Sequence, residues 1–249
     1  MIILKNREEK LKMKESNRIV ALVLKEIEKK IKPGVKTIDL DKFAEELIRK
    51  EGAVPGFKGY LGYPATLCIS IDEEIVHGIP SERKLKEGEI VSIDVGTIKD
   101  GFYGDGARTY AVGEIDESGK KLMETTEKSL YIGIEKAIPG NRLSDISNAI
   151  QTHIESEGFS VVRDFVGHGI GRNLHEDPQI PNYGDPGMGP VIREGMTFAI
   201  EPMVCEGKSW KTKILPDGWT AVCEDGSRAA HFEHTIFINA EGPEILTVA

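Results

Sequence analysis

Apolar residues recur every three or four positions in two stretches near the start of the chain, and this pattern predicts a pair of helices. The first helix is expected from about Glu8 to Ile31, where Pro33-Gly34 ends the run. The second helix is expected to begin at Thr37, whose side chain suits an N-cap, and to end at Gly52, which suits a C-cap. The chain therefore opens with two helices joined by a short turn.

The same arrangement returns later in the chain. Residues 31–52 match residues 137–158 at a constant offset of 106 residues, with Pro-Gly in front and Glu-Gly behind. Further along, Glu87–Asp94 resembles Glu194–Glu201, because in both segments a Glu-Gly turn leads into an apolar strand that ends in a carboxylate. We interpret these matches as an internal repeat, with each half a helix pair followed by antiparallel strands about a pseudo-twofold axis.

The two halves are expected to share one core. No Ser-, Gly- or Pro-rich linker separates residues 8–115 from residues 116–249, so we expect a single catalytic domain over residues 1–249 with an α+β fold. Residues 205–227 carry two Asp-Gly turn signals and both tryptophans. We expect this segment to form an extended hairpin or loop that borders a site.

The composition is that of a soluble globular protein. Of the 249 residues, 39% are hydrophobic and 29% charged, and no apolar run approaches the ~18 residues of a membrane helix. The start of the chain lacks the apolar stretch of a signal peptide. A net charge of −9 disfavours binding to nucleic acid through phosphates. The three cysteines, Cys68, Cys205 and Cys223, have no CxxC spacing, so we expect reduced thiols in a cytoplasmic protein.

Two aspartates are expected to lie side by side on a hairpin. Asp100-Gly101 between two β-rich runs predicts a type I′ turn, which sets Asp94 opposite Ala107. Asp105 then points to the same face as Asp94, as its diagonal neighbour on the other strand. Two carboxylates that close repel each other unless a cation lies between them. The alternative is a solvated hairpin with two surface acids, which the surrounding apolar residues and glycines disfavour.

Further candidate ligands lie in the second half. The glycine-rich segment Phe165–His175 is not a GxGxxG phosphate loop and is expected to form strand and loop, with His168 and His175 held in a crowded place. Either histidine alone is more often structural than a ligand. Glu201 and Glu233 lie within apolar strands, where a glutamate is costly unless it is paired or binds a metal. A surface position is the alternative for Glu233, whereas the apolar neighbours on both faces of Glu201 disfavour it there.

Taken together, four carboxylates and one imidazole form a candidate ligand set for two divalent cations: Asp94, Asp105, His168, Glu201 and Glu233. Oxygen-rich ligation suits Mn, Fe(II) or Co better than a thiolate-type metal site. Two cations ~3.5–4 Å apart can share a hydroxide and stabilise the oxyanion of a tetrahedral intermediate. The residues thus predict metal-assisted hydrolysis of an amide or ester.

The sequence resembles the type I methionine aminopeptidases of the short bacterial kind over nearly its whole length. The segments that carry the resemblance occur in the family's order: His77-Gly78-Ile79-Pro80, Asp94-Val95-Gly96, Gly104-Asp105, Phe165–His175 with Pro181-Asn182-Tyr183, Ile200–Met203 and Phe232–Thr235. The resemblance implies a pita-bread fold, with two pseudo-symmetric halves around a dinuclear metal site. It also implies removal of the initiator methionine from nascent proteins when the second residue is small.

The resemblance assigns each candidate ligand a role. Asp94 would hold one cation, and Asp105 and Glu233 would bridge both. His168 and Glu201 would complete the second cation site. A hydroxide that bridges the two metals would attack the first peptide bond, with Glu201 transferring protons around it.

The resemblance also implies substrate contacts. His175 would donate a hydrogen bond to the scissile carbonyl as charge develops, and His77 would contact the amide nitrogen side. The methionine pocket would be lined by aromatic and soft apolar side chains, which suit a thioether: Phe57, Tyr60, Tyr63, Cys68, Leu174 and Trp219. Phe57 stands where a small residue is frequent in the family and Leu174 where an aromatic is frequent, so tolerance for the second residue and inhibitor fit are expected to differ in detail.

The other histidines receive structural interpretations. His153 lies in a polar helix, and His234 points to the strand face opposite Glu233. His231 shares the face of Glu233 and is expected to lie next to the ligands without being one of them. Cys68 as a catalytic nucleophile is a weak alternative, because no His–Asn/Asp pair is suggested beside it.

Three alternative classes of protein would differ from this sequence in a recognisable way. A proline-specific peptidase of the same fold would match only the second half of a longer polypeptide, and a type II methionine aminopeptidase would carry a helical insert between His168 and Glu233. A non-catalytic ribosome-associated relative would lose ligands and gain basic surface. We therefore expect a cytoplasmic monomer that acts on nascent polypeptide N-termini, with transient ribosome contact left open and no nucleic-acid or membrane partner.

Overall fold

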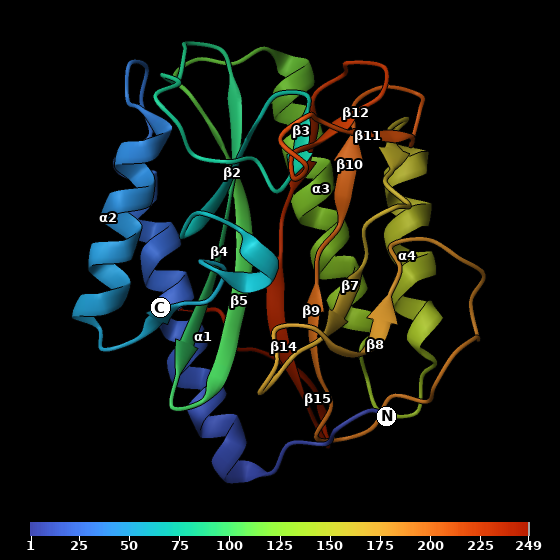
Figure 1. The fold of residues 1–249 in the computed structure, drawn as a ribbon. Coiled ribbons are helices and arrows are strands. Elements are labelled where there is room, and N and C mark those ends of the chain that lie inside the picture. Colours follow the sequence, from blue (N-terminus) through green and yellow to red (C-terminus); the bar gives the residue numbers. More distant parts are fainter. Residues whose placement is uncertain (249) are drawn as a thin grey trace.

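The computed structural model describes residues 1–248, in which two helix pairs flank four small sheets (Figure 1). The helices are α1 (Arg7–Glu28), α2 (Thr37–Lys50), α3 (Glu117–Lys136) and α4 (Leu143–Ser156), with a short 3-10 helix at Tyr60–Gly62. The strands of the first half are β1 (Val54–Pro55), β2 (Leu67–Ile71), β3 (Glu74–Val76), β4 (Ile90–Lys99) and β5 (Phe102–Ala111). Those of the second half are β6 (Ser160–Val161), β7 (Gly167–Gly169), β8 (Glu176–Ile180), β9 (Thr197–Ile200), β10 (Met203–Cys205), β11 (Thr212–Ile214), β12 (Ala221–Cys223), β13 (Ala229–His231), β14 (His234–Asn239) and β15 (Gly242–Ile245).

Each helix pair packs on the largest sheet of its own half. Helices α1 and α2 share an apolar core with β2 and β4, and α3 and α4 share another with β9 and β14. In the first half β4 pairs with β1, β2 and β5, and in the second half the order is β15-β14-β9-β7-β8. The blue helices and the green-to-yellow helices therefore lie on either side of the strands in Figure 1. None of the helices in residues 1–248 has the length and apolar character needed to cross a bilayer.

The internal repeat predicted from the sequence is present in the backbone. Helices α2 and α4 begin and end at positions that correspond at the offset of 106 residues. The Pro-Gly turns before them adopt the same conformation, with φ of +89° at Gly34 and +97° at Gly140. Their N–H groups donate to the carbonyls of Leu85 and Ile192, at 2.7 and 3.0 Å. The α+β pita-bread architecture with two pseudo-symmetric halves is thus confirmed, while the extent of a single domain over residues 1–249 stays a prediction.

The Glu-Gly turns open the corresponding strands. Gly88 and Gly195 have φ of +88° and +86°, a region that favours glycine, and they lead into β4 and β9. Asp94 lies within β4, and Glu201 follows the last residue of β9. The repeat therefore delivers one carboxylate from each half to the middle of the molecule.

The β4–β5 hairpin has the predicted register. Asp100 and Gly101 both have positive φ, +50° and +77°, as a type I′ turn requires. Asp94 pairs with Ala107, so Asp105 lies diagonally across from Asp94 on the same face of the sheet.

Hydrogen bonds at the site join the two halves. The N–H of Glu233 donates to the carbonyl of Ala107 at 2.9 Å, and the hydroxyl of Thr235 donates to the carbonyl of Asp105 at 2.8 Å. The backbone of β5 is therefore held against the start of β14, and the carboxylates of both halves meet there.

Two predicted helix ends differ from the structure. Helix α1 ends at Glu28 rather than near Ile31. Thr37 is the first residue of α2 rather than its N-cap, which is Lys36. The Thr37 hydroxyl instead donates to the carbonyl of Ser81 at 3.0 Å and accepts from its N–H at 2.8 Å, so its side chain ties the helix to the loop before β4.

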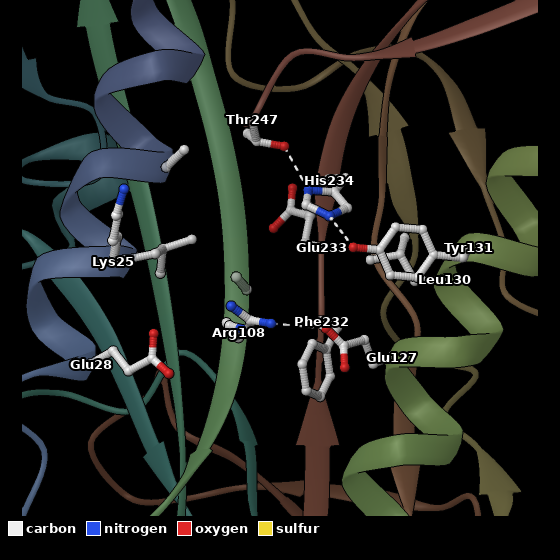
Figure 2. A pocket seen from close by; sticks show the side chains of 13 residues that line it. Lys25, Glu28, Arg108, Glu127, Leu130, Tyr131, Phe232, Glu233, His234 and Thr247 are labelled. Carbon is white, nitrogen blue, oxygen red and sulfur yellow. Dashed lines mark hydrogen bonds and ion pairs between the residues drawn. The ribbon is translucent and has the colours of Figure 1, made fainter. Parts of the chain in front are cut away.

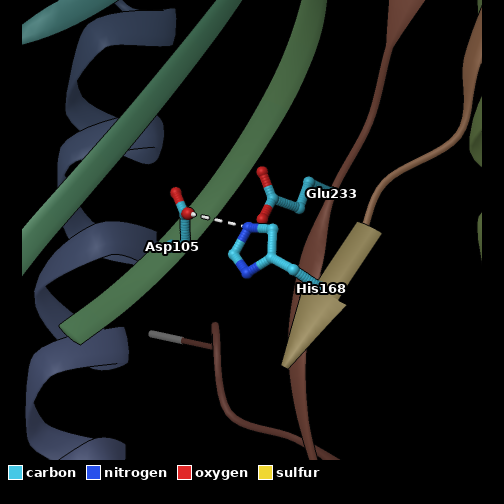
Figure 3. Close-up of side chains that lie close together, drawn as sticks. All are labelled: Asp105, His168 and Glu233. Carbon is cyan, nitrogen blue, oxygen red and sulfur yellow. Dashed lines mark ion pairs between the residues drawn. The ribbon is translucent and has the colours of Figure 1, made fainter. Parts of the chain in front are cut away.

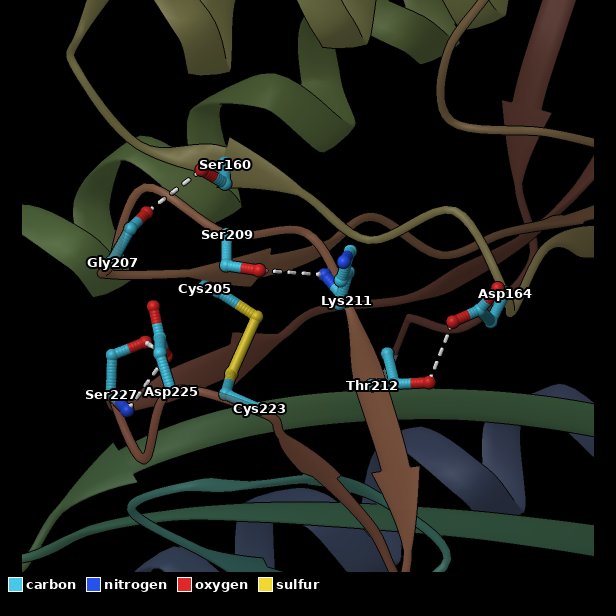
Figure 4. Close-up of a disulfide and its surroundings, with 10 residues drawn as sticks. All are labelled: Ser160, Asp164, Cys205, Gly207, Ser209, Lys211, Thr212, Cys223, Asp225 and Ser227. Atoms are coloured by element: carbon cyan, nitrogen blue, oxygen red, sulfur yellow. Dashed lines mark hydrogen bonds between the residues drawn. A yellow bond between two sulfur atoms is a disulfide. The ribbon is translucent and has the colours of Figure 1, made fainter.

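The prediction of three reduced thiols is wrong for two of the cysteines. Cys205 of β10 and Cys223 of β12 form a disulfide (Figure 4), and Cys68 is a free buried thiol. The backbone N–H of Cys223 donates to the carbonyl of Glu73 at 2.9 Å, and the backbone N–H of Ala229 donates to the carbonyl of Asp72 at 2.7 Å. These bonds set β12 beside β13, which pairs with β10, and the Cα atoms of the two cysteines come within 6.5 Å, a separation that a disulfide spans.

Strand β5 packs closely on helix α1 at Gly104. A Cβ added at this position would lie 2.8 Å from backbone atoms of Ser16 and Asn17, which cannot move without shifting the helix. We expect Gly104→Ala to lower the free energy of unfolding by about 1–3 kcal/mol in urea denaturation. Gly119→Ala is the matched control, because its Cβ would meet side-chain atoms rather than backbone, those of Arg228 at 3.0 Å and Asp116 at 3.2 Å. A loss no larger than that of the control, within about 1 kcal/mol, would contradict the tight contact.

Candidate metal centre

Four carboxylates converge between the two halves, two from each. Asp94 and Asp105 project from the β4–β5 hairpin. Glu201 and Glu233 were expected inside strands, but each lies in a short break, Glu201 between β9 and β10 and Glu233 between β13 and β14. At both breaks the chain passes from one sheet to another, which turns the glutamates toward the hairpin. Asp105 and Glu233 are buried, and Asp94 and Glu201 are partly exposed.

His168 faces these carboxylates from β7. Its Nδ1 lies 2.9 Å from the carbonyl of Gly169, which can only accept, so Nδ1 carries the proton and the lone pair is on Nε2. Nε2 lies 3.5 Å from Oε1 of Glu201 and 3.8 Å from Oδ2 of Asp105. One donor atom each from Asp105, His168 and Glu233 lies within 4.8 Å of the other two (Figure 3). We call these three residues the first triad.

The buried oxygens of the cluster fit divalent cations. Oδ1 of Asp94, Oδ1 of Asp105 and Oε1 of Glu233 are buried and have no hydrogen-bond partner among residues 1–248. Burial raises the pKa of Asp94 to about 7 and that of Glu201 to about 8. Such oxygens are costly to bury unless something cationic binds them, and a divalent cation would restore their charged forms. A donor set of mostly carboxylate oxygens with imidazole nitrogen nearby suits Mn, Fe or Co.

A cavity of about 170 Å³ opens beside the carboxylates. Every residue that the sequence assigned to substrate contact lines it: Phe57, Tyr60, Tyr63, Cys68, His77, Leu174, His175 and Trp219. Leu61 also lines the cavity and was missed. It lies in the short 3-10 segment with φ of +48° and is 80% exposed, and no periodic pattern in the sequence marks such a residue.

His175 is held at the boundary between the cavity and the carboxylates. Its Nδ1 lies 2.8 Å from the hydroxyl of Tyr60. Its ring meets that of His168 edge to face, with centroids 4.4 Å apart. This position leaves the Nε2 side of His175 available to a group bound next to the carboxylates.

His77 and Trp219 form another wall. His77 has φ of +63°, uncommon for a residue other than glycine, and its ring packs edge to face on Phe165 at 5.4 Å. Trp219 contacts both His77 and Tyr63, with ring centroids 6.5 and 5.1 Å away. Trp219 belongs to the 205–227 segment, so this segment borders the cavity as expected.

Cys68 does not have the environment of a nucleophile. Burial raises the pKa of its thiol well above the usual value, with the nearby carboxyl of Asp94 adding to the shift. A reactive cysteine needs the opposite, an electropositive setting that favours the thiolate.

His234 points away from the carboxylates, as expected. Its Nδ1 lies 2.7 Å from the hydroxyl of Thr247 and its Nε2 lies 3.3 Å from the hydroxyl of Tyr131. These contacts belong to a second pocket, of about 280 Å³, that faces α1 and α3 and shares Glu233 with the first cavity (Figure 2). Arg108 and Glu127 form an ion pair at 3.0 Å in the same pocket.

His231 is the one histidine whose position the sequence understated. It is 1% exposed, and its Nε2 lies 3.6 Å from Oε2 of Glu201 without a hydrogen-bond partner. The alternation His231-Phe232-Glu233 indicates that residues 231 and 233 share a face, but not that His231 also lies next to Glu201.

The fold and the cluster together define a class: a pita-bread metallopeptidase, with a cluster of candidate metal ligands between two repeated halves. The family model of metallopeptidase family M24 matches residues 11–240, and the chain belongs to this family. Among its relatives, methionine aminopeptidase 1 of Bacillus subtilis is 55% identical over 99% of both chains, and a methionine aminopeptidase of Clostridium perfringens is 53% identical over 100% of this chain and 99% of the relative. Within M24 the chain therefore falls among the methionine aminopeptidases, which confirms the resemblance seen in the sequence.

Solved structures agree with this placement. The crystal structure of methionine aminopeptidase from Thermotoga maritima superposes with a TM-score of 0.98 at 53% identity, with all of both chains covered. The prolidase of Pyrococcus horikoshii superposes with a TM-score of 0.80 at 24% identity. This chain covers 64% of that prolidase, and the likeness is one of fold.

Proposed function

We propose that this protein is a metal-dependent aminopeptidase that removes the N-terminal initiator methionine from proteins whose second residue is small. The observation that carries the proposal is a buried cluster of unpartnered carboxylate oxygens beside a cavity with aromatic and apolar walls. The relatives at 55% and 53% identity, named methionine aminopeptidases, support it.

The proposed ligands are those named from the sequence. Asp94 would hold one cation, Asp105 and Glu233 would contact both, and His168 and Glu201 would hold the other. When bound, the two cations would supply a nucleophilic water at neutral pH and polarise the scissile carbonyl. We propose Co, Mn or Fe(II) as the metals, since the donors are mostly oxygen.

The chain's own groups would orient the peptide and move protons. The carboxyl of Glu201, which lies 3.5 Å from Nε2 of His168, would exchange a proton with the attacking water. His175 would donate to the carbonyl oxygen of the first residue, held in position by Tyr60. His77, on the opposite wall, would contact the amide nitrogen.

The cavity would take the methionine side chain. Phe57, Leu174 and Trp219 supply apolar and aromatic surface, and Cys68 adds a soft, protonated thiol. Tyr63 cannot turn into the cavity freely, because its hydroxyl donates to the carbonyls of Leu67 and Gly78 at 2.9 Å. The natural substrates would be nascent chains in the cytoplasm, met by a monomer with transient contact to the ribosome.

Peptide cleavage tests the proposal. We expect release of free methionine from Met-Gly-type peptides and little or none from Met-Leu-type peptides, measured by chromatography with Co(II), Mn(II) or Fe(II) added in turn. A chelator should abolish release, and returning the metal should restore it. A Met-Gly peptide with an acetylated N-terminus is the matched control and should not be cleaved. Equal cleavage of both peptides, or cleavage only of peptides with proline in second position, would overturn the assignment.

A further inference from the structure

The ligand atoms of the metal centre form two overlapping groups, each with its own imidazole. The first triad is Asp105, His168 and Glu233. A second triad is formed by one donor atom each from Glu201, His231 and Glu233, again all within 4.8 Å of one another. Glu233 belongs to both, which is the arrangement expected of a carboxylate between two cations.

The backbone of His231 is held on both sides by hydrogen bonds to neighbouring strands. Its backbone N–H donates to the hydroxyl of Thr109 at 2.9 Å, and its carbonyl accepts from the same hydroxyl at 2.8 Å. On the other side its strand β13 pairs with β10, with His231 opposite Met203. The backbone of His231 is thus held by two neighbouring strands, which fixes the position from which its imidazole projects.

The Nε2 atom of His231 makes no hydrogen bond to any of residues 1–248. It is buried, lacks a hydrogen-bond partner, and lies 3.6 Å from Oε2 of Glu201, too far for a hydrogen bond. Two donors that bind one cation at ~2.1 Å lie about 3 to 4.2 Å apart. The 3.6 Å to His231 and the 3.5 Å from Oε1 of Glu201 to Nε2 of His168 both fall in this range. The Glu201 carboxylate therefore presents one oxygen to each imidazole.

We infer that His231 is a sixth protein ligand, that its Nε2 binds the cation that His168 does not, and that Glu201 contacts both cations with one oxygen each rather than only the cation that His168 holds. Each cation then has one imidazole nitrogen, rather than one cation having only oxygen ligands. A site of this kind favours Fe, Co or Ni at both positions over Mn or Mg, because imidazole nitrogen suits those metals better. This inference rests on the proposed dinuclear centre and deepens it.

The number of bound imidazoles can be counted directly in the Co(II)-loaded protein. A histidine that binds Co(II) through Nε2 gives a strongly shifted proton NMR signal from its Nδ1–H, and this signal disappears in D₂O. We expect two such signals in the wild-type protein loaded with two equivalents of Co(II), one of which is missing in His231→Gln and the other in His168→Gln. His153→Gln is the matched control, because His153 also has an unpartnered Nε2 but belongs to neither triad, and should keep both signals.

Calorimetry supplies a second readout. We expect His231→Gln to weaken one of the two Co(II) binding steps by at least about 10-fold and to leave Mn(II) less affected. A single exchangeable signal in the wild-type protein, or two signals in His231→Gln, would overturn the inference. The number of signals in the wild-type protein is measured without any variant. A single signal there would therefore overturn the inference even if His231→Gln failed to fold.

The outcome is independent of peptide cleavage. Two signals without methionine release would uphold the role of His231 and overturn the proposed function. Methionine release by a wild-type protein with one signal would do the reverse.

Discussion

Asp105→Asn should reduce methionine release by at least about 1,000-fold. The proposed bridging role means that this one substitution weakens both cation sites while changing almost no volume. Two cations stabilise the transition state by several kcal/mol, and each 1.36 kcal/mol corresponds to a factor of ten in rate. Turnover of a Met-Gly-type peptide at saturating Co(II), with bound metal measured by calorimetry, provides the test.

The same variant should be more stable than the wild type when metal is absent. Burial and the neighbouring Asp94 raise the pKa of Asp105, so at pH 7 the folded metal-free protein must either keep a buried charge or take up a proton. Asparagine removes that cost, and the urea midpoint of the metal-free protein should rise. Asp100→Asn is the matched control, because it makes the same change at the turn of the same hairpin, where asparagine tolerates the positive φ. Wild-type activity in Asp105→Asn would contradict the ligand assignment.

His175→Ala should lower kcat by about 100- to 1,000-fold, the usual loss when a donor to a developing oxyanion is removed. Metal binding should stay close to that of the wild type, since His175 belongs to neither triad. The two measurements are kcat on a Met-Gly-type peptide and the Co(II) binding isotherm.

His153→Ala, on the outer helix α4, is the comparison for this second variant. It should retain both kcat and the isotherm. If His175→Ala lost its metal together with its activity, the residue would act through the cations rather than on the substrate. An unchanged kcat would show that no hydrogen bond from His175 to the carbonyl matters for the rate.

The parts of the fold that were predictable are those with local, repeated signals. Helices α2 and α4 were predicted because a Pro-Gly turn, an apolar stripe and a Glu-Gly end occur twice. The β4–β5 hairpin was predicted because Asp100-Gly101 fixes its register, and the register alone brings Asp94 and Asp105 to one face. In these cases the residues that determine the geometry are neighbours in sequence.

The parts that were not predictable depend on contacts between distant segments. Nothing near Cys205 or Cys223 in sequence indicates that β10 and β12 lie close together, since that follows from where the carbonyls of Asp72 and Glu73 lie. The strand breaks at Glu201 and Glu233 likewise arise because the chain passes from one sheet to another there. An uninterrupted apolar run in the sequence does not indicate such a change of sheet. The ring of His231 lies close to Glu201 because β13 pairs with β10, with His231 opposite Met203, and this pairing brings the two breaks side by side.

The division of donor types between the halves has a consequence for how metal preference can change. Residues 1–115 offer the centre only carboxylates, from Asp94 and Asp105, whereas both imidazoles of the two triads come from the later half. Hard oxygen donors accept any common divalent ion, so the earlier half would serve each of them alike. Adaptation to iron-poor or cobalt-rich surroundings would then require substitutions in only one copy of the repeat, while the other copy stayed as it is.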